Sequence, residues 1–127
     1  MNYVKSFRDL EVYKIVRQLS GEIFKVSKNF PKEEMYSLTD QVRRSSRSIG
    51  AQIAEAWGKR KYEKHFVSKL TDADGEQLET QHWIEIALDC SYISKEVASE
   101  LLQQCFSIGK MLNSMILKAP TFCNKSN

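Results

Sequence analysis

The sequence predicts an all-α fold, an antiparallel up-down-up-down bundle of four helices. Three observations favour this fold class. Only 5 glycines and 2 prolines occur in 127 residues, which leaves little material for the tight turns of a β-sandwich or a barrel. Four segments carry apolar residues at steps of three and four, the spacing of one helix face. The connections between these segments are short, so sequential helices are expected to run antiparallel.

The first two predicted helices each carry one apolar stripe. The first covers residues 9–28 and ends before Pro31. The second begins at Ser37, whose hydroxyl is expected to cap it together with Asp40, and it ends at Gly58. The stripes consist of Val12, Ile15, Val16, Leu19, Ile23 and Val26 in the first helix, and of Leu38, Val42, Ile49, Ile53 and Ala56 in the second.

The third and fourth predicted helices follow the basic break at 58–61. The third is the less regular, because Gly75 and Gln77 weaken the middle of its stripe. Ser94 is expected to cap the fourth, and Pro120 to end it. The stripes are Phe66, Leu70, Ala73, Leu78, Ile84, Ala87 and Leu88, then Val97, Leu101, Cys105, Ile108, Leu112 and Met115.

The length fits one domain, 1–127, with the bundle at about 7–118. The remaining tail, 119–127, is expected to be mobile because it has too little apolar surface to offset the entropy lost on ordering. Apolar residues outside the stripes, such as Phe24, Val67, Ile86 and Ile116, predict a second buried surface and therefore oligomerisation.

Charge is distributed unevenly, although the net charge is only +3. Residues 40–69 hold eight basic and three acidic residues, a balance of +5, and residues 70–100 hold one basic and eight acidic residues, a balance of −7. A polyanionic partner would respond to this local field rather than to the net charge. The candidate nucleic-acid-binding residues are Arg43, Arg44, Arg47, Lys59, Arg60, Lys61 and Lys64.

Three of these candidates, Arg43, Arg44 and Arg47, lie within one helical turn, and a guanidinium donates two parallel hydrogen bonds to phosphate. Because no base-reading helix pattern or stacking platform is evident, any RNA binding is expected to be weakly sequence-specific and salt-sensitive. An alternative interpretation is that the basic second helix and the acidic third helix pair with each other, within a subunit or between subunits. Both interpretations remain open from the residues alone.

Catalytic and cofactor sites are not indicated. The Glu79-x-x-His82 spacing occurs in di-iron bundles, but those take two such motifs, and His65 has Tyr62 three residues before it. Trp83 is expected to anchor packing. No phosphate-binding loop, dinucleotide fingerprint or nucleophile elbow is present. Cys105 lies on an apolar stripe and is expected to be a core residue. We therefore expect no enzyme activity, no metal or cofactor, and no small-molecule substrate.

The chain is also expected to be cytoplasmic and to have no membrane partner. Its longest uncharged run, 101–109, has nine residues, far too few to span a bilayer. The N-terminus is charged where a signal peptide is apolar. The odd cysteines Cys90, Cys105 and Cys123 favour neither a disulfide framework nor a zinc site.

Several stretches together resemble a known family: FRDLEVY from Phe7, FPKEE from Phe30, QVRRSSRSIGAQIAEAW from Gln41, and ETQHWIEIALDCSYI from Glu79. The chain resembles, over about 5–117, the bacterial four-helix bundle proteins first recognised as products of intervening sequences in large-subunit ribosomal RNA genes, often labelled ribosomal-protein-like. The family usually has glycine where this chain has Ser91.

The resemblance implies a four-helix bundle assembled as a homo-oligomeric ring, a homopentamer, without catalytic activity. Relatives include the basic accessory protein of diversity-generating retroelements, which works with a reverse transcriptase and nucleic acid. The resulting hypothesis is a noncatalytic oligomeric scaffold that contacts RNA or a nucleic-acid-handling protein through the basic patch. The competing hypothesis is a pure protein–protein module whose charged segments serve ring assembly or partner docking.

Overall fold

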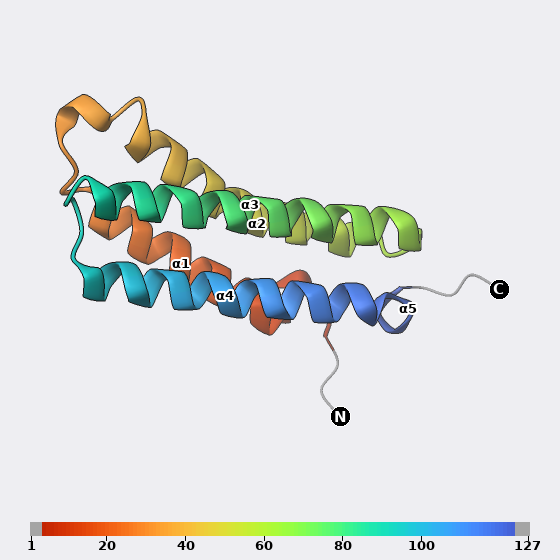
Figure 1. Ribbon diagram of the computed structural model, residues 1–127. Coiled ribbons are helices and arrows are strands. Elements are labelled where there is room, and N and C mark those ends of the chain that lie inside the picture. Colours follow the sequence, from red (N-terminus) through yellow and green to blue (C-terminus); the bar gives the residue numbers. More distant parts are fainter. Residues whose placement is uncertain (1–3, 124–127) are drawn as a thin grey trace.

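The computed structural model describes residues 4–123 and shows four long helices packed around one core, as predicted. They are α1 (Glu11–Ser27), α2 (Leu38–Gly58), α3 (Glu63–Asp89) and α4 (Lys95–Leu117). Each helix packs against the next, and α1 also packs against α4, so α2 and α4 lie diagonally across the bundle. The chain runs back and forth along one axis (Figure 1), and no strand occurs in the described part.

The core is built from the predicted stripes. Val16, Leu19 and Ile23 of α1 are buried, as are Ile49 and Ile53 of α2. The stripe of α4 is buried from Leu101 to Met115, and Cys105 is fully enclosed within it. Burying such side chains contributes roughly 1.5–3 kcal/mol each to stability. Periodicity therefore located most of the core, but the prediction for Leu78 was wrong, since Leu78 is 55% exposed and the regular steps along α3 bury Gln77 and Thr80 instead.

A polar layer joins α2 to α3. Helix α3 continues without interruption past Gly75, although the sequence indicated a weak middle there. Gln77 and Thr80 are buried at this level, and Thr80 Oγ1 lies 2.9 Å from Ser45 Oγ. The two hydroxyls form a hydrogen bond, so neither is left without a partner where the helices meet.

The start of α2 differs from the prediction. Ser37 precedes the helix, but its side chain accepts no hydrogen bond from the helix backbone. Its hydroxyl instead donates to Oε1 of Glu34 at 2.6 Å, and the Leu38 N–H also donates to this oxygen, at 3.4 Å. Glu34 belongs to the short 3-10 helix η2 (Lys32–Glu34). A carboxylate therefore takes over the capping role, which is favourable beside a helix N-terminus.

The turn after α3 places Ser91 at a φ of 63°, in the left-handed region. The Ser91 and Tyr92 N–H groups donate back to Leu88 O and Ala87 O, both at 2.9 Å, the pattern of a Schellman cap. Glycine is the usual residue at this point of the cap. Ser94 then caps α4 by accepting from the Val97 N–H at 3.1 Å, as predicted.

Two short elements lie outside the four long helices. The 3-10 helix η1 (Phe7–Asp9) precedes α1, and α5 (Ala119–Phe122) follows α4. Ala119 is buried, and the Phe122 ring stacks on Phe66 with centroids 6.0 Å apart. The bundle therefore extends beyond the predicted limit at 118, because Phe122 supplies apolar surface that the prediction underrated. The rest of the predicted tail, 124–127, lies outside the described residues.

Candidate nucleic-acid interface

The three arginines of α2 line one open groove on the outer side of the helix. The groove has a volume of about 470 Å³. Positions 43, 44 and 47 reach it together because residues three and four apart share a helix face. Its lining consists of Met35, Thr39, Asp40, Arg43, Arg44, Arg47, Ser48 and Ala51.

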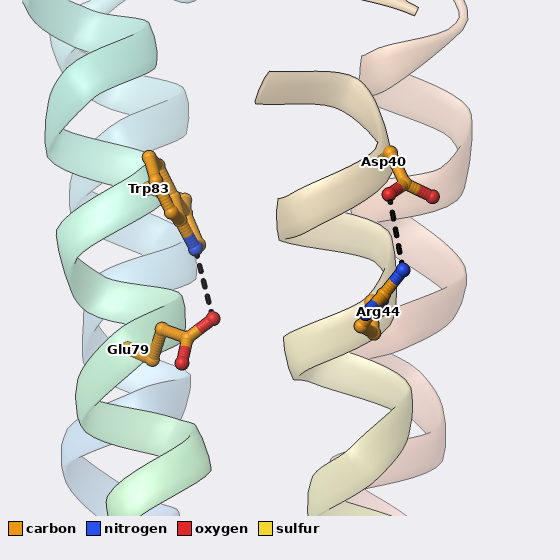
Figure 2. A network of polar contacts seen from close by, with 4 residues as sticks. All are labelled: Asp40, Arg44, Glu79 and Trp83. Atoms are coloured by element: carbon orange, nitrogen blue, oxygen red, sulfur yellow. Dashed lines mark hydrogen bonds and ion pairs between the residues drawn. The ribbon is translucent and has the colours of Figure 1, made fainter. Parts of the chain in front are cut away.

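Of the three arginines, Arg44 alone forms an ion pair within the part of the chain that the structure describes. Its Nη2 lies 3.4 Å from Oδ2 of Asp40, one turn earlier on α2 (Figure 2). The side chains are 69% and 47% exposed, and such surface pairs contribute only about 0–1 kcal/mol. The weak, exposed contact with Asp40 therefore leaves the Arg44 guanidinium accessible to an external phosphate.

Arg43 and Arg47 lie beside Phe24 of α1. Their Cζ atoms are 4.8 and 5.6 Å from the Phe24 ring centroid, and Nζ of Lys28 is 4.7 Å from it. Arg43 Nε also donates to Ser27 Oγ at 2.8 Å. Among residues 4–123, neither arginine nor Lys28 forms an ion pair with a carboxylate. Phe24 and Ser27 of α1, and Lys28 directly after it, were not predicted for this site.

Among the described residues 4–123, one ion pair joins α2 to α3. Lys69 Nζ of α3 lies 3.2 Å from Glu55 Oε1 of α2. The base comes from α3 and the acid from α2, which reverses the expected arrangement. Within the described part of one subunit, α3 carboxylates do not neutralise the α2 arginines.

The remaining basic candidates form a separate cluster at the turn between α2 and α3. Residue 59 lies twelve positions after Arg47, about 18 Å along the helix axis. Arg60 stacks on Trp57, with Cζ 3.6 Å from a ring centroid, and its Nε donates to the Trp57 carbonyl at 2.8 Å. The exposed members are Lys59, Lys61 and Lys64. The structure therefore divides the predicted site into two clusters.

Glu79 and Trp83 form a polar pair along α3. The indole Nε1 donates to Glu79 Oε2 at 3.1 Å (Figure 2), and Trp83 also packs against the core. His82 is exposed, with its ring 4.7 Å from that of Trp83. No group of three metal-ligating side chains occurs within residues 4–123.

Cys105 is enclosed in the core, as predicted. Burial raises the pKa of its thiol to about 12. Cys90 is exposed at the end of α3. Across the described residues, no helix is long and apolar enough to cross a bilayer.

Together these features define an all-α bundle protein with an exposed, arginine-lined groove on its second helix. The family model of the 23S rRNA-intervening sequence protein matches residues 8–114, and the chain belongs to this family.

A similar solved structure is a protein of unknown function from the S23 ribosomal protein family of Bacteroides thetaiotaomicron VPI-5482. It is 29% identical, with a TM-score of 0.75 over 83% of this chain and 94% of the other. No curated protein matches the chain in sequence.

Proposed function

We propose that this protein is a noncatalytic oligomeric scaffold that contacts RNA or a nucleoprotein through the basic surface of α2. The observation that carries the proposal is the groove lined by Arg43, Arg44 and Arg47. Only Arg44 has a carboxylate partner in the described part of the chain, and that pair is exposed. The groove therefore offers guanidinium groups to an external polyanion.

Phosphate is the RNA group that suits this surface. Arginine forks bind phosphate oxygens regardless of base identity, so the contact positions RNA without reading its sequence. The separate cluster of Lys59, Lys61 and Lys64 begins just past the end of α2, about 18 Å from Arg47 along the helix axis, and would contact a second part of an extended strand.

Self-association is the second part of the proposal. Leu78 and Phe106 are 55% and 45% exposed and line an open groove of about 480 Å³ between α3 and α4. Asp74 lies on the same groove. This groove contains none of the α2 arginines, so a head-to-tail contact between subunits through it leaves them free for RNA and can close into a ring. A homopentamer is the ring size that the family resemblance implies.

RNA binding by the arginines is tested with the variant Arg43→Ala/Arg44→Ala/Arg47→Ala. We expect its affinity for bulk RNA to fall about 10- to 100-fold, since three charge-assisted contacts are lost. A matched control removes three positive charges away from both grooves, by Lys14→Ala/Lys95→Ala/Lys118→Ala. Equal affinity of the folded arginine variant and the wild type would contradict the proposal.

The alternative is a protein–protein module without an RNA ligand. The exposed apolar pair Leu78 and Phe106 favours it, because such side chains are typical of protein interfaces. Sedimentation at low and high salt, with and without RNA, separates the two functions. Assemblies that dissociate in salt and never shift with RNA support the alternative, whereas an RNA-dependent shift supports the scaffold.

A further inference from the structure

Three cations gather around one aromatic ring where α1 meets α2. Nζ of Lys28 and the Cζ atoms of Arg43 and Arg47 all lie within 5.6 Å of the Phe24 ring centroid. The Phe24 side chain is 36% exposed, so the cluster is open to solvent. We call these four residues the Phe24 cluster.

The Phe24 cluster holds concentrated positive charge. Each cation is attracted by the face of the ring, but the ring carries no net charge and the cations repel one another. Within residues 4–123 none of the three forms an ion pair with an acidic side chain. The nearest acid on the adjoining groove is Asp40, whose carboxylate already contacts Arg44. An external anion would relieve this repulsion.

Arg43 is held in a defined orientation. Its Nε donates to Ser27 Oγ at 2.8 Å, and the Ser27 hydroxyl donates to the Phe24 carbonyl at 3.1 Å. Ser27 is buried, so this anchor is fixed by the bundle rather than by solvent. The anchor uses only Nε and leaves the two terminal nitrogens of the guanidinium for a ligand.

We infer that the Phe24 cluster is a binding site for a phosphomonoester, the dianionic group at a phosphorylated end of an RNA strand. A phosphomonoester carries about 1.5 to 2 negative charges at pH 7 and three terminal oxygens, and a backbone phosphodiester carries one charge. Three convergent cations therefore favour the strand end over the strand interior. This inference rests on the proposed RNA-binding function and adds the chemical group that is recognised.

The test uses three ten-nucleotide RNAs of one sequence that carry a 5′-phosphate, a 3′-phosphate or no terminal phosphate. Affinities are measured by fluorescence anisotropy, with an internal label, at one salt concentration. We expect at least one phosphorylated RNA to bind about tenfold more tightly than the unphosphorylated strand, as charge-assisted hydrogen bonds are gained. The phosphorylated RNA that binds more tightly shows whether the site recognises a 5′-phosphate or a 3′-phosphate.

Two variants test whether the preference for a terminal phosphate arises from the Phe24 cluster. Lys28→Gln/Arg47→Gln leaves the anchor between Arg43 and Ser27 intact, so its fold is expected to be retained, and Lys95→Gln/Lys118→Gln, on and just after α4, is the matched control. The preference is expected to disappear in the first variant and to persist in the control.

The remaining outcomes separate the inference from the proposed function. Equal binding of all three RNAs by the wild type overturns the phosphomonoester site and leaves RNA binding standing. A preference for phosphorylated RNA that persists in Lys28→Gln/Arg47→Gln also overturns the phosphomonoester site. Binding of none of the RNAs overturns both the site and the proposed function.

Discussion

The phenol of Tyr92 donates a hydrogen bond of 2.9 Å to Oε2 of Glu34, and so joins the turn after α3 to the segment before α2. Hydrogen bonds from Ser37 and then Tyr92 lower the pKa of Glu34 below 4.5. The bond to the Glu34 carboxylate raises the pKa of Tyr92 to about 12. One carboxylate therefore both caps α2 and ties two connections together at one end of the bundle.

Glu34→Gln is expected to lower the thermal midpoint at pH 7. The folded pKa of Glu34 lies below the unfolded value of 4.5, so its carboxylate stabilises the fold above pH 4.5 and loses this effect as the pH falls further. The difference between wild type and variant should therefore shrink below pH 4.5, as followed by circular dichroism. Glu100→Gln, on an exposed site of α4, is the control. A difference that stays constant down to pH 3 would contradict this role of Glu34.

Ser91→Gly is expected to stabilise the protein by about 1 kcal/mol, because it removes the Cβ strain of a left-handed residue. The φ of 63° and the Schellman hydrogen bonds at this turn motivate the change. Ser91→Ala keeps the Cβ and is the matched control, with no gain expected. Urea unfolding of the three proteins measures the difference. Equal stability of the glycine and alanine variants would show that the turn is unstrained.

The cysteines are expected to differ in reactivity in the folded protein. Cys105 is fully buried and burial raises its pKa to about 12, so little thiolate forms at pH 8. Cys90 is exposed and should be alkylated first. Iodoacetamide labelling followed by peptide mass spectrometry measures both rates, with labelling in urea as the control. Equal rates in the native protein would contradict the buried position of Cys105.

Much of the fold was predictable because one apolar stripe per helix is a local pattern. Steps of three and four placed Val16, Leu19 and Ile23 on one face, and burial followed from that face. The cap of α2 was not predictable in the same way. Ser37 has the residue type of a cap, but its hydroxyl donates its hydrogen bond to the Glu34 carboxylate of η2. That competition depends on the path of the loop, which periodicity does not describe.

The candidate site was predictable only along α2. Helical spacing correctly placed Arg43, Arg44 and Arg47 on one groove. The contribution of Ser27 and Phe24 depends on how α1 is aligned against α2, and Ser27 lies sixteen positions before its partner Arg43. Charge totals over long segments also suggested pairing between α2 and α3. Charge totals could not show that the buried residues of α2 and α3 are mainly apolar or small.

The salt dependence of RNA binding tests the central claim most directly, namely that the α2 arginines contact phosphates. The slope of log affinity against log salt is measured for the wild type, for Arg43→Ala/Arg44→Ala/Arg47→Ala and for the control Lys14→Ala/Lys95→Ala/Lys118→Ala. Loss of three phosphate contacts on single-stranded RNA should reduce the magnitude of the slope by about 2, with the control close to wild type. An arginine variant whose slope equals that of the wild type would contradict the account.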